Sequence, residues 1–291
     1  MAHPSVGMAS SASTSGAVSG ETRGGRTPKL PAKAVAAVVG WYCATVLLIT
    51  TNKFLMGTDF GLPVFLTFLH MLVSFLWCEF SANVGWSRRV PLKNWRDAGK
   101  VFALSQTLAV SVALAVASFK YVEVSLEQAL AASTPAFTAA GGVLILGKQE
   151  RSKVWLTLVP VMGGAMLAAG GEPKFHALGV CLVFASNVAR GVKSCLQELL
   201  LNKEAGLDSM SLLRWMSLFS MLTLLPMSCV LERPGVILEK LAFVWSDRRT
   251  FALLAANCGG AFLVNLTQFA VTSEVGALSM QVLGNVKVRT S

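Results

Sequence analysis

Residues 177–200 read ALGVCLVFASNVARGVKSCLQELL, a stretch long and apolar enough to span a bilayer. Arg190 and Lys193 lie well inside it, and each would cost about 2.5 to 3.5 kcal/mol if it faced lipid. On a helix these two cations share one face with the other polar residues of the stretch, Ser186, Asn187, Ser194 and Gln197. The stripe predicts one wall of a water-filled pathway with fixed positive charge, suited to an anionic solute. Snorkelling of the cations to an interface, or pairing with a buried acid, is the alternative.

The rest of the chain has the composition of a membrane protein. Of its 291 residues, 54% are hydrophobic and 14% are charged, and the mean hydropathy is +0.60. Apolar stretches of spanning length recur at residues 34–56, 62–82, 98–118, 124–146, 154–169, 177–200, 211–231 and 251–272. We therefore expect an all-α polytopic membrane protein with about eight spans and the start of a ninth near Ala277.

The net charge of +10 is sorted along the chain. Twelve basic residues lie before the first span, between the second and third, or after the fourth: Arg23, Arg26, Lys29, Lys33, Arg88, Arg89, Lys93, Arg96, Lys100, Lys148, Arg151 and Lys153. The loops between carry only Lys120 and Lys174. The positive-inside rule then predicts a cytosolic N-terminus, and the basic charge reflects topology rather than a nucleic-acid partner. The connection from Glu232 to Arg249 departs from this pattern, because it holds four basic residues on the predicted non-cytosolic side.

Motifs for catalysis or metal binding are missing from the sequence. The six cysteines all fall inside predicted spans without close pairing, and His70 and His176 are isolated. The chain has no Gly-rich phosphate loop, nucleophile elbow or paired-acid motif. We expect no metal, no cofactor and no enzymatic activity.

Three further spans carry polar side chains. Glu127 shares a helix face with Thr134 and Thr138, and three readings of it are open: a counter-ion for Arg190 or Lys193, a proton-coupling acid, or an interfacial residue. Neutral side chains recur on one side of the eighth span, at Asn257, Asn265, Gln268 and Thr272. They suit the hydroxyl and amide groups of a solute, or hydrogen bonds between helices. Gln281, Asn285 and Lys287 open the ninth span.

Residues 1–33 are rich in Ser, Thr, Ala and Gly and contain one acid, Glu21. We expect a disordered cytosolic tail, with a transit peptide as the alternative and no cleavable secretory signal.

Six ordered motifs carry a resemblance to a known family. They are FKYVEVSLEQALAASTPAF (119–137), GGEPKFHALG (170–179), ARGVKSCLQ (189–197), LDSMSLLRWM (207–216), VNLTQF (264–269) and VLGNVK (282–287). With them, residues 34–287 resemble the triose-phosphate translocator family of the drug/metabolite transporter superfamily. The branch most similar is the plant one of probable sugar phosphate/phosphate translocators, whose relatives include Golgi nucleotide-sugar carriers.

The resemblance implies ten helices in two inverted five-helix repeats, with antiport by alternating access. Arg190 and Lys193 match the basic pair of the sixth helix, and Lys287 matches the lysine of the ninth. Carriers of phosphorylated trioses are expected to have a lysine and an arginine where this chain has Ala131 and Val288. Fewer cations favour a larger solute that spreads its charge over a diphosphate. The expected substrate-binding set is Arg190, Lys193, Lys287, Asn187, Gln197, Asn265, Gln268, Asn285 and Glu127.

The expected function is exchange of a nucleotide sugar of the UDP-sugar class for a nucleoside monophosphate across the Golgi membrane. The alternative function is a sugar phosphate/phosphate exchanger. The alternative locations are the plastid envelope and the endoplasmic reticulum membrane, and a homodimer is possible. After Lys287 the sequence departs from the family pattern, so residues 288–291 are expected to be a non-family tail that truncates the second repeat. A non-transporting scaffold, or a partner of a full-length carrier, is therefore a third expectation.

Overall fold

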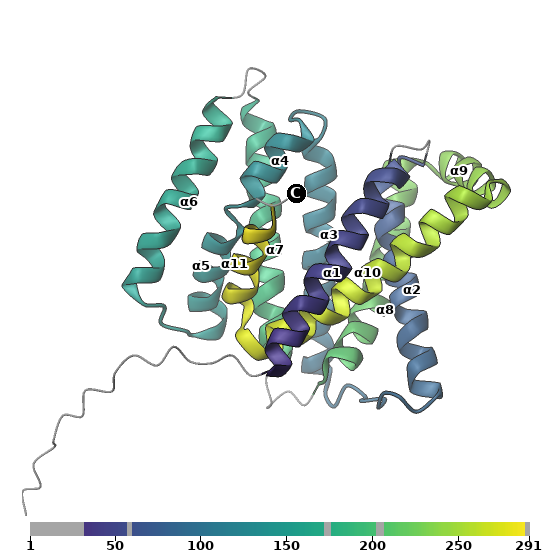
Figure 1. Ribbon diagram of the computed structural model, residues 1–291, viewed down its shortest axis with the longest axis horizontal. Coiled ribbons are helices and arrows are strands. Elements are labelled where there is room, and N and C mark those ends of the chain that lie inside the picture. The colour runs from purple at the N-terminus through teal and green to yellow at the C-terminus, as the bar shows by residue number, and fades with distance from the viewer. Residues whose placement is uncertain (1–31, 57–59, 172–175, 202–206, 289–291) are drawn as a thin grey trace, which may run out of the picture. The chain divides into compact units, whose positions relative to one another are not determined.

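The computed structural model describes residues 32–56, 60–171, 176–201 and 207–288, with side chains as far as Asn285. All regular structure in these ranges is helical (Figure 1). The helices are α1 (Ala32–Met56), α2 (Pro63–Asn83), α3 (Trp95–Ser118), α4 (Val124–Ala131), α5 (Thr134–Leu146), α6 (Ser152–Gly170), α7 (Ala177–Leu201), α8 (Ser209–Glu232), α9 (Pro234–Ser246), α10 (Arg248–Val275) and α11 (Ala277–Val288). The expected N-terminal tail lies outside the described residues up to Pro31, as does the expected C-terminal tail after Val288.

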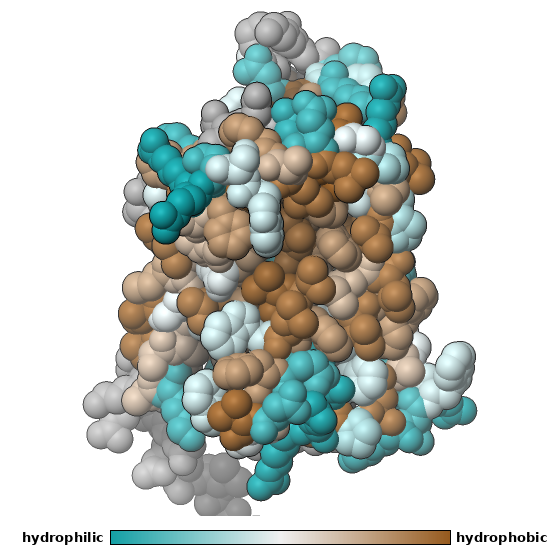
Figure 2. Space-filling model, turned by 90° about the vertical axis from the view of Figure 1, so that its right-hand side faces the viewer, coloured by the Kyte–Doolittle hydropathy of each residue, from teal (hydrophilic) through white to brown (hydrophobic). Residues whose placement is uncertain are grey.

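The helices confirm a polytopic membrane protein. Six described helices are long and apolar enough to cross a membrane, or seven if α4 and α5 count as one broken span. The polar stripe of α7 lowers its hydropathy, so this helix is not among them although it has 25 residues. Figure 2 shows hydrophobic surface forming a band between hydrophilic residues at both ends, as a bilayer-spanning segment requires.

The expected fourth span, residues 124–146, is not one continuous helix. It breaks between Ala131 and Thr134 into α4 and α5, which are bent by 43°. Pro135 lies at the start of α5 and lacks the amide hydrogen that a continuous helix would bond to the carbonyl four residues earlier. The length of the apolar stretch did not reveal this break, because residues 124–146 together are long enough for one span.

A second difference concerns the connection from Glu232 to Arg249, which was expected to be a loop. It contains α9, whose 13 residues are too few to cross about 30 Å of hydrocarbon. The Asp247 side chain accepts hydrogen bonds from the backbone nitrogens of Arg249 and Thr250, which caps α10. Hydrogen bonds from Thr250 hold the pKa of Asp247 below its ordinary value.

Three helix pairs determine how the described helices pack. α1 lies along α10, α2 along α8, and α3 along α7 (Figure 1). The largest hydrophobic cluster joins α2, α3, α8 and α10, and its fully buried members include Val64, Leu104, Leu213, Met216 and Phe269. The polar side chains of α7 contact α3, α4, α10 and α11.

Candidate functional site

Glycines let α7 approach its neighbours closely. A Cβ on Gly191 would lie 3.0 Å from the carbonyl carbon of Phe137 and 3.0 Å from the nitrogen of Thr138. At the start of the helix, a Cβ on Gly179 would lie 2.6 Å from the Cβ of Tyr121. Such distances exclude any larger residue without a backbone shift, so the two glycines set the depth at which α7 packs.

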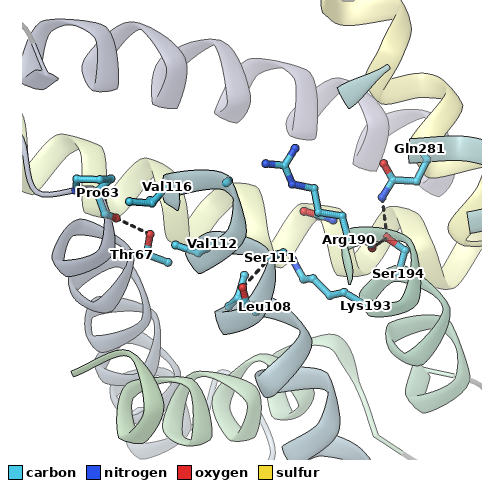
Figure 3. Close-up of a pocket in the computed structure, with 12 residues that line it drawn as sticks. Pro63, Thr67, Leu108, Ser111, Val112, Val116, Arg190, Lys193, Ser194 and Gln281 are labelled. Carbon is cyan, nitrogen blue, oxygen red and sulfur yellow. Dashed lines mark hydrogen bonds between the residues drawn. The ribbon is translucent and has the colours of Figure 1, made fainter. Parts of the chain in front are cut away.

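The polar face of α7 borders a cavity of about 310 Å³ (Figure 3). Five helices line it: α2, α3, α7, α10 and α11. Its polar side chains are Thr67, Ser111, Arg190, Lys193, Ser194, Gln268 and Gln281. Pro63 at the start of α2 and Val116 near the end of α3 mark the side towards which the cavity extends. By the predicted topology this is the non-cytosolic side.

Arg190 forms an ion pair at the border of the cavity. Its Nη2 donates to Oε1 of Glu127 on α4 over 2.8 Å. The Glu127 side chain is 8% exposed and the Arg190 side chain 34% exposed. Among the three readings left open for Glu127, this contact makes it the counter-ion of Arg190. A role in substrate binding remains a prediction.

Lys193 lines the same cavity one turn further along α7. In Figure 3 its side chain diverges from that of Arg190 and extends towards Ser111. Within the described part of the chain, no hydrogen bond or ion pair joins Lys193 to another residue. It therefore offers an unneutralised charge to a solute in the cavity.

Two of the expected substrate-binding residues hold the broken helix instead of lining the cavity. Nδ2 of Asn187 donates to the carbonyl of Leu130 over 2.9 Å, and Nδ2 of Asn285 donates to the carbonyl of Ala132 over 2.7 Å. The carbonyl of Leu130 also accepts from the backbone nitrogen and the hydroxyl of Ser133, so Asn187 adds a bond from α7 to a carbonyl that already has local partners. Each amide nevertheless ties another helix to the break, where no bulk water is present to satisfy a backbone carbonyl. Oδ1 of Asn187 is buried without a hydrogen-bond partner among the described residues.

The other expected site residues separate into groups. Gln268 lines the cavity, whereas Gln197 is fully buried and donates through Nε2 to Oγ1 of Thr272 over 2.9 Å. Asn265 is half-buried on α10 and is not among the lining residues. Lys287 falls on α11, but its side chain lies outside the described residues.

Four polar residues that line the cavity were not in the expected substrate-binding set: Thr67, Ser111, Ser194 and Gln281. Ser194 and Gln281 were visible in the sequence as part of the polar stripe and of the ninth span, whereas Thr67 and Ser111 were not noted. Nε2 of Gln281 donates to Oγ of Ser194 over 2.6 Å and so joins α11 to α7. The available signal for Ser111 was the recurrence of serine along α3, where Ser105, Ser111 and Ser118 are all buried. Single hydroxyls in an apolar helix are weak signals, because they can bond to their own backbone.

Opposite the side marked by Pro63, helices α5, α7 and α11 are tied together. Glu198 near the end of α7 pairs with Lys148, and its Oε2 accepts from the backbone nitrogen of Ala277 over 2.9 Å. A carboxylate at the first residue of α11 also favours that helix through its dipole. We call this set, Lys148, Glu198 and Ala277, the clasp. It joins the three helices at the end of the bundle that is predicted to be cytosolic.

A bundle of membrane-spanning helices around a cationic cavity defines a polytopic membrane carrier for small anionic solutes. Residues 32–290 match the Triose-phosphate Transporter family. A probable sugar phosphate/phosphate translocator of Arabidopsis thaliana is 37% identical over 258 residues, covering 87% of this chain and 82% of the relative. The chain therefore belongs to the Triose-phosphate Transporter family.

Two further relatives carry the names of nucleotide-sugar carriers. UDP-uronic acid transporter 1 of Arabidopsis thaliana is 36% identical, over 86% of this chain and 82% of the relative. A GDP-mannose transporter of the same plant is 26% identical, over 88% of this chain and 75% of the relative. The chain is thus similar to carriers named for sugar phosphates and to carriers named for nucleotide sugars.

Proposed function

We propose that this protein is an antiporter that exchanges a nucleotide sugar for a nucleoside monophosphate. The observation that carries the proposal is the cavity, which is lined both by the cations Arg190 and Lys193 and by the neutral amides Gln268 and Gln281. Cations suit phosphate oxygens, and amides suit the hydroxyl groups of a sugar or the edges of a base. The relative named for UDP-uronic acid, 36% identical to this chain, supports the nucleotide-sugar reading.

The number of free cations in the cavity distinguishes this proposal from its alternative, a sugar phosphate/phosphate exchanger. A phosphate with two negative charges on one centre favours several free cations at one point. Here Glu127 already pairs with Arg190, and Ala131 stands where a further lysine is expected in carriers of phosphorylated trioses. A diphosphate that spreads its charge requires fewer cations. The relative named a probable sugar phosphate/phosphate translocator, 37% identical to this chain, keeps the exchanger as the second candidate.

Alternating access accounts for exchange, and the helix pairing supports an inverted repeat. We count α4 and α5 together as the fourth helix and leave α9 out of the repeat. In this count α1 is the first helix, α3 the third, α7 the sixth and α10 the eighth. Inverted five-helix repeats make the first–eighth and third–sixth contacts equivalent. These are the pairs α1 with α10 and α3 with α7. The proposed membrane is that of the Golgi, with a cytosolic N-terminus.

Exchange in proteoliposomes tests the proposed function. The purified chain is reconstituted with UMP inside, and uptake of radiolabelled UDP-sugars is measured. Parallel vesicles contain inorganic phosphate or no counter-substrate. Uptake that needs internal UMP supports the proposal, uptake that phosphate drives equally well supports the exchanger, and no uptake in any vesicle contradicts both.

A further inference from the structure

Arg190 both lines the cavity and binds a residue of α4. It is a lining residue of the cavity, yet its Nη2 is bonded to Glu127 over 2.8 Å. The Glu127 carboxylate is buried and is not among the lining residues, so the guanidinium stands between it and the cavity. A carboxylate and a phosphate oxygen engage the same guanidinium donors. A phosphate that enters the cavity therefore meets a cation that already holds an anion.

Lys193 is not occupied in this way. Three residues from Arg190 on the same helix face, its amine makes no ion pair within the described ranges. The two cations consequently differ: Lys193 is available at once, whereas Arg190 becomes available only when Glu127 gives way.

We propose that Glu127 is an internal competitor of the substrate, which neutralises Arg190 in the empty cavity and is displaced when an anion binds. The inference rests on the proposed function, since it concerns the same cavity. It selects solutes with two anionic centres, because one centre can engage Lys193 while the other replaces the carboxylate on Arg190. A single compact phosphate gains less from Lys193 and still has to break the Glu127–Arg190 pair.

The rival explanation is that Glu127 only holds Arg190 in position. The two explanations predict opposite changes in anion affinity for the neutral variant Glu127→Gln. Without a competitor, Arg190 is free and anions bind more tightly; without a positioning partner, Arg190 is misplaced and anions bind more weakly.

The affinity of the purified full chain for anions decides between the two explanations. Isothermal titration with inorganic phosphate, UMP and UDP-glucose is carried out on the parental protein, Glu127→Gln and the matched control Glu239→Gln. Glu239 is exposed on α9 and is not a cavity residue. We expect Glu127→Gln to bind phosphate roughly tenfold more tightly, which is about 1.4 kcal/mol, and UDP-glucose by a smaller factor. Glu239→Gln should bind all three probes as the parental protein does.

A double-mutant cycle shows whether the effect passes through Arg190. In an Arg190→Gln background the competitor has nothing to occupy, so adding Glu127→Gln should leave phosphate affinity unchanged. If Glu127→Gln does not fold, Glu127→Asp takes its place, because the shorter side chain keeps the charge but weakens the contact, and it should tighten phosphate binding by a smaller factor.

The outcomes separate the inference from the proposed function. Unchanged or weaker anion binding by Glu127→Gln, with the parental protein binding normally, overturns the competitor and leaves the carrier proposal standing. A gain that persists in the Arg190→Gln background also overturns it. Failure of every variant and the parental protein to bind any of the three probes overturns the proposed function, and the inference with it.

Discussion

A Cβ built on Gly191 would lie 3.0 Å from the carbonyl carbon of Phe137, so α7 and α5 are in backbone contact beside the cavity. Arg190 precedes this glycine in the chain, and Lys193 follows it by two residues. The position of both cations therefore depends on a residue without a side chain.

Gly191→Ala should displace α7 from α5, because the added methyl group meets backbone atoms that cannot rotate away. We expect a loss of about 1 to 3 kcal/mol in stability and weaker binding of UDP-glucose. Thermal unfolding and titration in detergent measure the two effects. Gly164→Ala is the matched control, since nothing lies within 4 Å of a Cβ at that glycine. Equal behaviour of the two variants would show that the close approach is not required.

Arg190→Lys should lose affinity for phosphate-containing substrates although the charge is kept. A lysine cannot form the planar two-point contact of a guanidinium with a phosphate, and its amine is a point charge. We expect a loss of about tenfold, and a larger loss for Arg190→Ala. Exchange of UDP-sugar for UMP in proteoliposomes gives the comparison. Parental rates in both folded variants would make Arg190 a packing residue.

The clasp should control access to the cavity from the end where Lys148 and Ala277 lie. Glu198→Gln removes the charge that pairs with Lys148 and weakens the acceptor for the Ala277 nitrogen. We expect faster labelling of a Gln281→Cys reporter by a membrane-impermeant maleimide applied on that side. Glu274→Gln is the control, because Glu274 is exposed near the same end of α10. A labelling rate that does not rise in Glu198→Gln would exclude the clasp as a gate.

The topology is tested by labels on two connections. The rule that basic loops are cytosolic puts Ser87 on the cytosolic side and Lys120 on the opposite side. Single Ser87→Cys and Lys120→Cys substitutions are made after Cys43 and Cys181, which are exposed, are changed to serine. An impermeant reagent added to sealed vesicles whose cytosolic face is outward should react only with position 87. Reaction at position 120 alone would invert the arrangement.

Several properties of the protein follow from its amino-acid sequence alone. The membrane class follows from apolar segments, because about 20 such residues match the hydrocarbon thickness whatever their neighbours are. Arg190 and Lys193 are recognisable because charges inside such a segment are costly in lipid and so indicate a polar environment. The family match over residues 32–290 likewise needs only the sequence.

Only the tertiary structure decided which polar residues face the cavity. Asn187 and Gln268 are both amides in membrane helices, yet the first bonds to the carbonyl of Leu130 and the second lines the cavity. Their sequence surroundings do not distinguish these roles, because the difference lies in what the neighbouring helix presents. For the same reason the pairing of Glu127 with Arg190, 63 positions apart, required the packing of α4 against α7. Helical periodicity places a side chain on a face, and only packing between helices supplies its partner.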